Sequence, residues 1–166
     1  MMKILLTLFV LLFSSSVFAD AISDFEIEGI SIGDSLLDYM SEEKIKTEFK
    51  RTRFMYKRLT EKFGEAYLYD GLQTYAYMSL YVKTDDRKFI IYAIRGQIPF
   101  IKDIWGCHKK QNEIAEEISK KFKDATKREV SFKHRVDPTG RSTLDAIIFT
   151  FNSGDTMQVR CSNFEE

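Results

Sequence analysis

The sequence predicts an α+β fold in which a meander of antiparallel strands forms one layer and helices pack on one face of it. Three observations predict this fold class. Two segments carry apolar residues at helical spacing, several segments alternate in polarity, and short turns join neighbouring strands. Strands joined by short turns pair in antiparallel fashion, and the helices between them cover one face, which gives two layers.

The first nineteen residues differ from the rest of the chain. Lys3 precedes the apolar run of residues 4–13, and small residues then lead to Ala19. A basic region, an apolar region and an A-x-A-like site in this order are typical of a secretory signal peptide. The run is also shorter than the roughly 20 apolar residues that span a bilayer. We therefore expect residues 1–19 to be a cleaved signal peptide, followed by a single globular domain over residues 20–166.

Export defines the expected compartment. The segment has no twin arginine and no cysteine at the cleavage site, so we expect export by the general route without a lipid anchor. The compartment is then a bacterial periplasm or, as the alternative, the exterior of the cell. Cleavage would leave 147 residues with a net charge near −1. This near-neutral balance argues against a nucleic-acid partner.

Three elements are expected in the first third of this domain. Residues 25–32 alternate in polarity as a short edge strand does, and Asp34 or Ser35 can cap a helical turn. A long helix-compatible run follows from Ser41, and Gly64 stands just beyond it as a stop signal. One face of that run carries residues at spacings of three and four: Ile45, Phe49, Thr52, Tyr56, Leu59 and Phe63.

The remaining elements follow the same logic. We expect strands at 74–83 and 88–98 and a helix over 107–122. Three strands then follow at 130–136, 145–151 and 156–161. The expected order is therefore strand, helix, two strands, helix, three strands. Two helix-then-meander units in tandem are an alternative organisation.

The two cysteines, Cys107 and Cys161, both follow the expected cleavage site. In an oxidising compartment an even number of cysteines favours a disulfide. Cys107 would stand at the start of a helix on its buried face, and Cys161 would close the last strand. The bond would close a loop of about 54 residues. The chain-entropy model predicts that such a bond stabilises the folded state by roughly 4 kcal/mol. Free thiols or a redox role, with His108 beside Cys107, are the alternatives.

Two segments resemble known proteins. Residues 30–37 read Ile-Ser-Ile-Gly-Asp-Ser-Leu-Leu, and residues 107–114 read Cys-His-Lys-Lys-Gln-Asn-Glu-Ile. Together they resemble small exported proteins of marine alphaproteobacteria whose function is uncharacterised. Residues 32–35 before a helix and a meander are similar, more weakly, to the small-protein-A family of outer-membrane assembly. That family carries a lipid-modified cysteine that has no counterpart here, so this likeness implies the fold alone.

Motifs for catalysis and metal binding are sparse. The two histidines, His108 and His134, do not form a metal-binding spacing, and there is no nucleophile-elbow, P-loop or dinucleotide-binding motif. The pair Asp85 and Asp86 is typical of a solvated turn, and residues 152–155 lack calcium-loop spacing. The sequence therefore indicates no cofactor, no metal and no catalytic residue.

Two sets of residues are candidate binding surfaces. The first long helix carries a basic stripe that could meet anionic lipid or an acidic partner: Lys46, Lys50, Arg53 and Lys57. Alternatively, its charges only keep the helix soluble. The strand at 74–83 carries a tyrosine row opposite its aliphatic face, with Tyr67 and Tyr69 upstream: Tyr75, Tyr77 and Tyr81. Such a row can bind peptide or glycan, or its rings can simply be half-buried strand residues.

We therefore expect a non-enzymatic exported protein that binds an envelope component or a small ligand. The expected partner is an envelope protein, a peptide or an anionic membrane surface. One alternative is a small periplasmic hydrolase whose carboxylates come together only on folding, because such pairs leave no sequence signature. Another is an inhibitor or stress protein without a substrate. The sequence does not indicate an oligomeric state.

Overall fold

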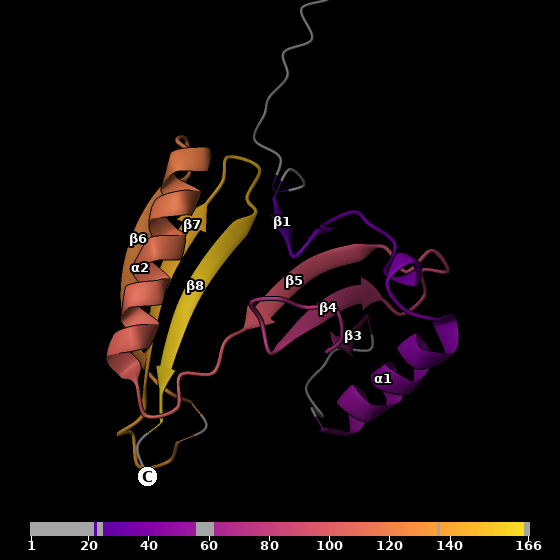
Figure 1. Cartoon of the computed structure of the whole chain (residues 1–166), viewed down its shortest axis with the longest axis horizontal. Coiled ribbons are helices and arrows are strands. Elements are labelled where there is room, and N and C mark those ends of the chain that lie inside the picture. Colours follow the sequence, from indigo (N-terminus) through magenta and orange to yellow (C-terminus); the bar gives the residue numbers. More distant parts are fainter. Residues whose placement is uncertain (1–21, 23–24, 56–61, 136, 165–166) are drawn as a thin grey trace, which may run out of the picture.

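The computed structural model describes residues 22, 25–55, 62–135 and 137–164, and these form two helix–meander units in tandem (Figure 1). The predicted signal peptide lies outside the described residues. A hairpin, β1 (Glu26–Ile27) and β2 (Ile30–Ser31), and a short 3-10 helix (Leu36–Asp38) precede the first unit. The first unit contains α1 (Glu42–Met55), β3 (Phe63–Leu68), β4 (Tyr77–Lys83) and β5 (Ile91–Gln97). The second contains α2 (Ile104–Lys121), β6 (Thr126–Lys133), β7 (Thr143–Thr150) and β8 (Thr156–Asn163).

Each unit has its own antiparallel sheet. The strand orders are β3-β4-β5 and β6-β7-β8, so each meander runs in chain order. In the first sheet Ala66 pairs with Leu80 and Leu80 with Ile94. In the second sheet Ile147 pairs with Val159. The α+β fold class and the antiparallel meander are confirmed, and the tandem alternative describes the arrangement of the described residues.

The first core lies between α1 and one face of the first sheet. Ile45 of α1 and Leu80 of β4 are fully buried in it, together with residues of the N-terminal hairpin and the 3-10 helix. The ring of Phe49 lies so close to Gly64 that a Cβ there would be 2.7 Å from it. Glycine at this position therefore lets α1 approach β3 closely.

The second core lies between α2 and one face of the second sheet. Ile118 of α2 packs with Ile147, Phe149 and Met157 of the strands. The predicted disulfide is confirmed, because Cys107 in the first turn of α2 is bonded to Cys161 of β8. The side chain of Gln111, itself buried, donates to the carbonyl oxygens of Asp145 and Val159 at 3.0 and 2.8 Å. These contacts hold α2 on the second sheet, with one helix on one face of each sheet.

Some predicted boundaries are wrong. The predicted first helix included Phe63, but Phe63 is the first residue of β3, a strand that the sequence analysis did not predict. Gly64, the predicted stop signal, is a strand residue. The strand predicted at 74–83 begins at Tyr77, and α2 begins three residues before Cys107, where Asp103 caps it by accepting from Gly106 N–H at 2.8 Å. Within the described part of the chain, no helix is both long and apolar enough to cross a membrane.

Candidate functional site

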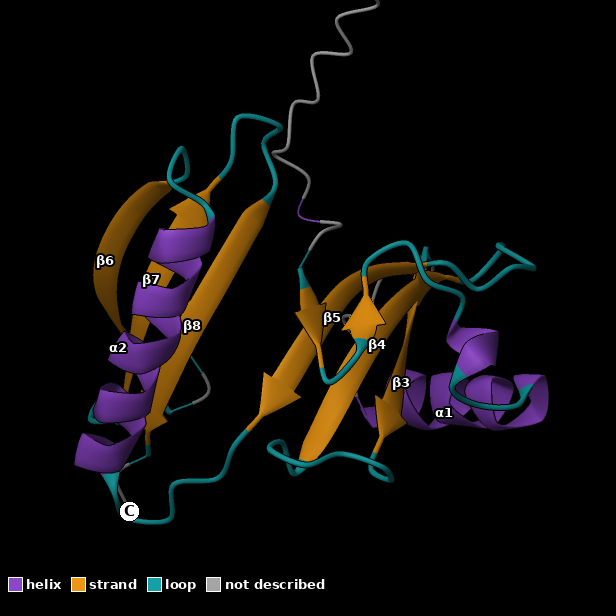
Figure 2. Cartoon of the chain, turned by 45° about the horizontal axis from the view of Figure 1, so that its top comes forward, coloured by secondary structure: helices purple, strands orange, loops and turns teal. Residues whose placement is uncertain are grey.

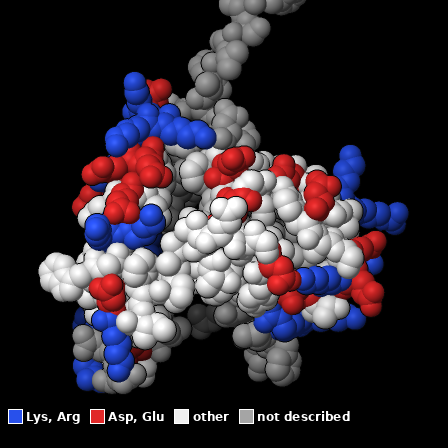
Figure 3. Space-filling model, in the orientation of Figure 1, with Lys and Arg blue, Asp and Glu red and all other residues white. Residues whose placement is uncertain are grey.

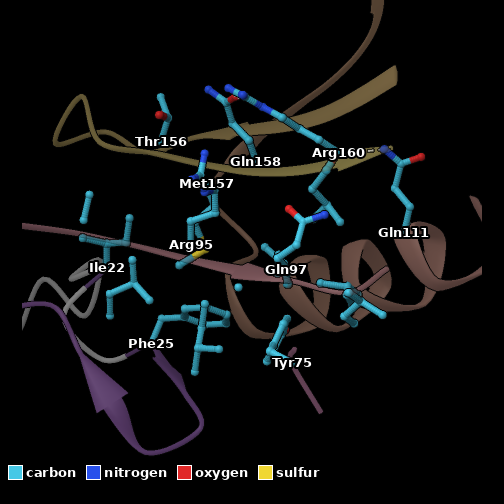
Figure 4. Close-up of a pocket in the computed structure, with 18 of the residues that line it drawn as sticks. Ile22, Phe25, Tyr75, Arg95, Gln97, Gln111, Thr156, Met157, Gln158 and Arg160 are labelled. Carbon is cyan, nitrogen blue, oxygen red and sulfur yellow. Dashed lines mark hydrogen bonds between the residues drawn. The ribbon is translucent and has the colours of Figure 1, made fainter. Parts of the chain in front are cut away.

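A cleft of about 680 Å³ lies between the two units, and two sheet edges line it (Figure 4). Because the strand orders end at β5 and β8, each of these strands is the last of its sheet. Residues 92–98 line the cleft from the first unit and residues 154–161 from the second. Small-molecule sites in proteins range over roughly 300–1,000 Å³, so the cleft has the size of a binding site.

The helix side of the cleft is apolar. Ile94 and Ile98 contribute from β5 and the segment after it, Ile114 from α2 and Val159 from β8. These residues belong to or continue the faces that pack in the two cores. An apolar group of a ligand would therefore find a continuous apolar wall on this side.

The opposite side of the cleft is polar and mainly basic. Arg95 and Gln97 alternate with the apolar residues of β5, and Gln158 and Arg160 do so on β8, because successive side chains of a strand point to opposite faces. Figure 4 shows the four side chains on the same side of their strands, away from Tyr75 and Phe25. Lys110 also lines the cleft, whereas its one carboxylate among the described residues is Asp155. The surplus of positive charge favours an anionic ligand.

The arginines differ in their partners. Arg95 is held at 3.0 Å from the carboxylate of Glu65 and from the hydroxyl of Ser79. Arg160 donates to the neutral side-chain oxygen of Gln158, and none of the ion pairs between described residues involves it. Arg160 is therefore the cation of the cleft whose charge is not compensated within the described part of the chain.

Described residues near the N-terminus contact both units beside the cleft. Ile22 and Phe25 pack against the second core, whereas Ile27 packs against the first. The Phe25 ring lies 6.2 Å from the ring of Phe122, and Lys121 lies over it at 5.8 Å. Ile22, Phe25 and Ile27 thus link the two cores in addition to the segment after β5, and both sets of residues contribute to the cleft lining.

The structure divides the predicted tyrosine row. Tyr75 precedes β4, packs against the first core and lines the cleft, where a Cβ on Gly96 would be 2.4 Å from its ring. Burial raises the pKa of the Tyr75 hydroxyl. Tyr77 and Tyr81 point to the opposite face of the sheet, away from the buried Met78 and Leu80. The sequence analysis placed all three on one face because it extended the strand back to residue 74.

Tyr77 belongs to a cluster of three tyrosine rings. Its ring lies 5.4 Å from that of Tyr67 and 6.0 Å from that of Tyr69, and Arg51 of α1 lies over Tyr67 at 4.8 Å. Tyr81 instead donates to the buried Glu65 at 2.7 Å. Both residues therefore have packing and hydrogen-bonding roles within the first sheet.

The predicted basic stripe is only partly described. Lys46 pairs with Glu42 at 2.6 Å, one turn earlier on α1, and Lys50 is exposed. Arg53 belongs to α1 without a described side chain, and Lys57 lies outside the described residues. Cations and anions alternate over both helices in the view of Figure 3, with a largely uncharged band between them. The described part of the stripe does not meet the cleft.

The histidines have local partners. His108 lies 3.1 Å from a carboxylate oxygen of Asp145, and the ring of His134 lies 4.5 Å from that of Phe164. Among the described residues, no group of three His, Cys, Asp or Glu side chains could hold a metal ion.

The fold and the site define an α+β protein of two helix–meander units with a cleft between two sheet edges. In comparisons with protein-family models, with curated proteins and with solved structures, none matches the chain. The resemblances described from the sequence therefore stay predictions.

Of the residues that line the cleft, only Tyr75 was predicted from the sequence as a ligand contact. Arg95, Ile114 and Arg160 were not predicted, because the pattern of a single strand or helix does not show which edges meet in space. One signal was present, since the last strand of a meander has a neighbour on one side only. The positions of β5 and β8 at the ends of their meanders could have identified both edges.

Proposed function

We propose that this protein is an exported, non-enzymatic binding protein and that the cleft between its two units is the binding site. The ligand combines an apolar body with an anionic group and belongs to the cell envelope. The observation that carries this proposal is the lining of the cleft, apolar on the helix side and mainly cationic on the other. The same lining offers one carboxylate among the described residues, whereas a hydrolase of the predicted kind needs two.

Export supports the choice of an envelope ligand. The signal-peptide pattern of residues 1–19 and the Cys107–Cys161 disulfide both favour an oxidising compartment outside the cytoplasm, and the proposed location is the periplasm. In that location the small-protein-A likeness adds a fold-level analogy with other envelope proteins. The tyrosine cluster of the first sheet is a second surface for an envelope partner, but its rings are engaged with one another.

The proposal is tested with dodecanoate, which has an apolar chain and a carboxylate. We expect the mature chain to bind it, and we expect Ile114→Glu to weaken binding at least about tenfold, because the new carboxylate would face the apolar wall and repel the ligand. Isothermal titration calorimetry measures the affinity. The matched control is Ile101→Glu, since Ile101 is 85% exposed and does not line the cleft. Equal affinity of both variants and the natural chain would contradict the proposal.

A further inference from the structure

The free edges of β5 and β8 face the same cleft, and they differ from the edge of β3. On β3 the backbone is engaged by α1, since Thr52 donates to the carbonyl oxygen of Glu65 and Glu48 accepts from the N–H of Tyr67, at 2.9 and 3.1 Å. Exposed edge strands are templates for pairing with another chain, and proteins usually cover them in this way. The edges of β5 and β8 border a cavity instead.

The hydrogen bonds at the two ends of β5 show which of its backbone groups face the cleft edge. The carbonyl oxygen of Gln97 accepts from Ala76, just before β4, and so points inward. At the start of the strand, the backbone of Ile91 bonds to Gly33 and Asp34, which lie on the edge of β5 that faces away from β4. Counting back from Gln97, successive residues direct their backbone groups to opposite edges, so Ile94 and Gly96 direct theirs away from β4. The register shift opposite Tyr81 and Val82 explains why Ile91 also points to that edge. Among the described residues, no hydrogen bond engages Ile94 and Gly96 on that side.

The two edge strands run in similar directions. In Figure 1 and Figure 2 the arrows of β5 and β8 point broadly the same way, and the gap between the two strands widens away from the arrowhead of β5. A chain inserted between them would therefore be antiparallel to both or parallel to both. Either choice allows its alternating N–H and C=O groups to bond to β5 on one side and to β8 on the other.

We infer that the ligand of the cleft is an extended peptide strand that joins the sheets of the two units through the edges of β5 and β8. This inference rests on the proposed function and names its ligand class. Addition of a strand to a sheet edge is a common mode of peptide recognition, in which backbone bonds give affinity and side-chain pockets give specificity.

The cleft lining selects the peptide's side chains. Every second residue of an inserted strand points to the helix side, where Ile94, Ile114 and Val159 form the apolar wall. The residues between them point to the side of Arg95 and Arg160, and Arg160 has no anionic partner among the described residues. The preferred peptide therefore alternates apolar and acidic residues.

The test uses the mature full chain and an acetylated, amidated peptide, Val-Glu-Val-Glu-Val-Glu-Val. We expect it to bind, and we expect the same peptide N-methylated at its valines to bind at least about tenfold more weakly, because its backbone can no longer donate to one edge. Amide hydrogen exchange should slow at Ile94 and Gly96 when the peptide binds. Equal binding of the N-methylated peptide, or binding without protection of these amides, would overturn the inference.

The preference for acidic peptides is tested by a separate experiment. Replacing the peptide's glutamates by lysines should weaken binding to the natural chain, and Arg160→Glu should reverse the preference between the two peptides by about tenfold in each direction. Arg160 is an exposed strand residue, so this variant is expected to fold. An unchanged preference would contradict the acidic specificity.

Negative results in the peptide and dodecanoate experiments bear on different proposals. Binding of dodecanoate in the cleft without binding of the peptide would overturn the strand inference and leave the proposed function standing. Failure of both probes would overturn both.

Discussion

Glu65 is the one carboxylate that is buried among the described residues, with 2% of its surface exposed. Tyr81 donates to it at 2.7 Å and Arg95 at 3.0 Å, so its charge is compensated by two neighbouring strands. Arg95 then lies between Glu65 and the cleft. Arg95, which contributes to the charge of the site, is therefore held in place by a buried acid on β3, two strands away on the same face of the sheet.

We expect Glu65→Ala to lower the free energy of unfolding by about 2–3 kcal/mol, because it removes the acceptor of two hydrogen bonds and leaves polar groups without their buried partner. Chemical denaturation measures this loss. The control is Glu129→Ala, whose carboxylate is exposed and pairs with Lys127 at 2.9 Å. Exposed pairs contribute about 0–1 kcal/mol, so equal losses in the two variants would contradict the role of Glu65.

Asp34 gives a pH dependence that can be measured. Tyr39 donates to it at 2.6 Å and Ser31 N–H at 2.8 Å, and these bonds hold the pKa of Asp34 below its ordinary value of 3.8. A lowered pKa in the folded state means that the stabilisation is present above pH 3.8 and is lost as the pH falls through the lowered pKa. The N-terminal hairpin is thus more stable with the carboxylate ionised.

We expect Asp34→Asn to lower the unfolding free energy by about 1 kcal/mol at pH 7, because a neutral amide accepts these bonds more weakly than a carboxylate. The difference from the natural chain should shrink towards pH 2. Thermal unfolding followed across this pH range measures it. A difference that stays constant with pH, or an equal effect of the exposed Asp38→Asn, would contradict the assignment.

At the scale of elements, the disulfide joins the start of α2 to the last strand of its sheet. The bond closes a separation of 54 residues, and Cys161 is buried. Chain entropy predicts a stabilisation of roughly 4 kcal/mol for a loop of this length. The second unit would then depend on the bond more than the first unit does.

We expect the double variant Cys107→Ser and Cys161→Ser to lose about 3–4 kcal/mol of unfolding free energy. Amide hydrogen exchange should rise first in α2 and β8, which the bond connects, and less in β4 and β5. Denaturation and hydrogen exchange of the natural chain with and without reductant provide the comparison. Uniform loss of protection in both units would contradict a local role for the bond.

Elements with a clear period were predictable from the sequence, whereas β3 was not. The stripe of α2 and the alternation of β8 identify those elements because each buries one face. In β3, Phe63 continues the helical spacing of α1, and Gly64 resembles a helix stop. The strand assignment depends instead on pairing with β4, for example of Ala66 with Leu80, and such pairing is not visible in a local pattern.

At the scale of the whole molecule, the site is a product of the tandem arrangement. Tyr75 was predicted as a contact from its own strand, but the groups around it come from α2, β8 and the N-terminal segment. These segments are far apart in the sequence, and no periodicity relates them. The sequence shows which residue types are present, but only the structure shows which of them lie together in the cleft.

We propose that the cleft between the two units is where this protein binds its ligand. Nuclear magnetic resonance of isotope-labelled residues 20–166, titrated with dodecanoate, tests it most directly. We predict shift changes at Ile94, Ile114 and Val159, with little change at the tyrosine cluster of Tyr67 and Tyr77. Changes confined to the tyrosine cluster, or no changes at saturation with either dodecanoate or the peptide, would contradict the claim.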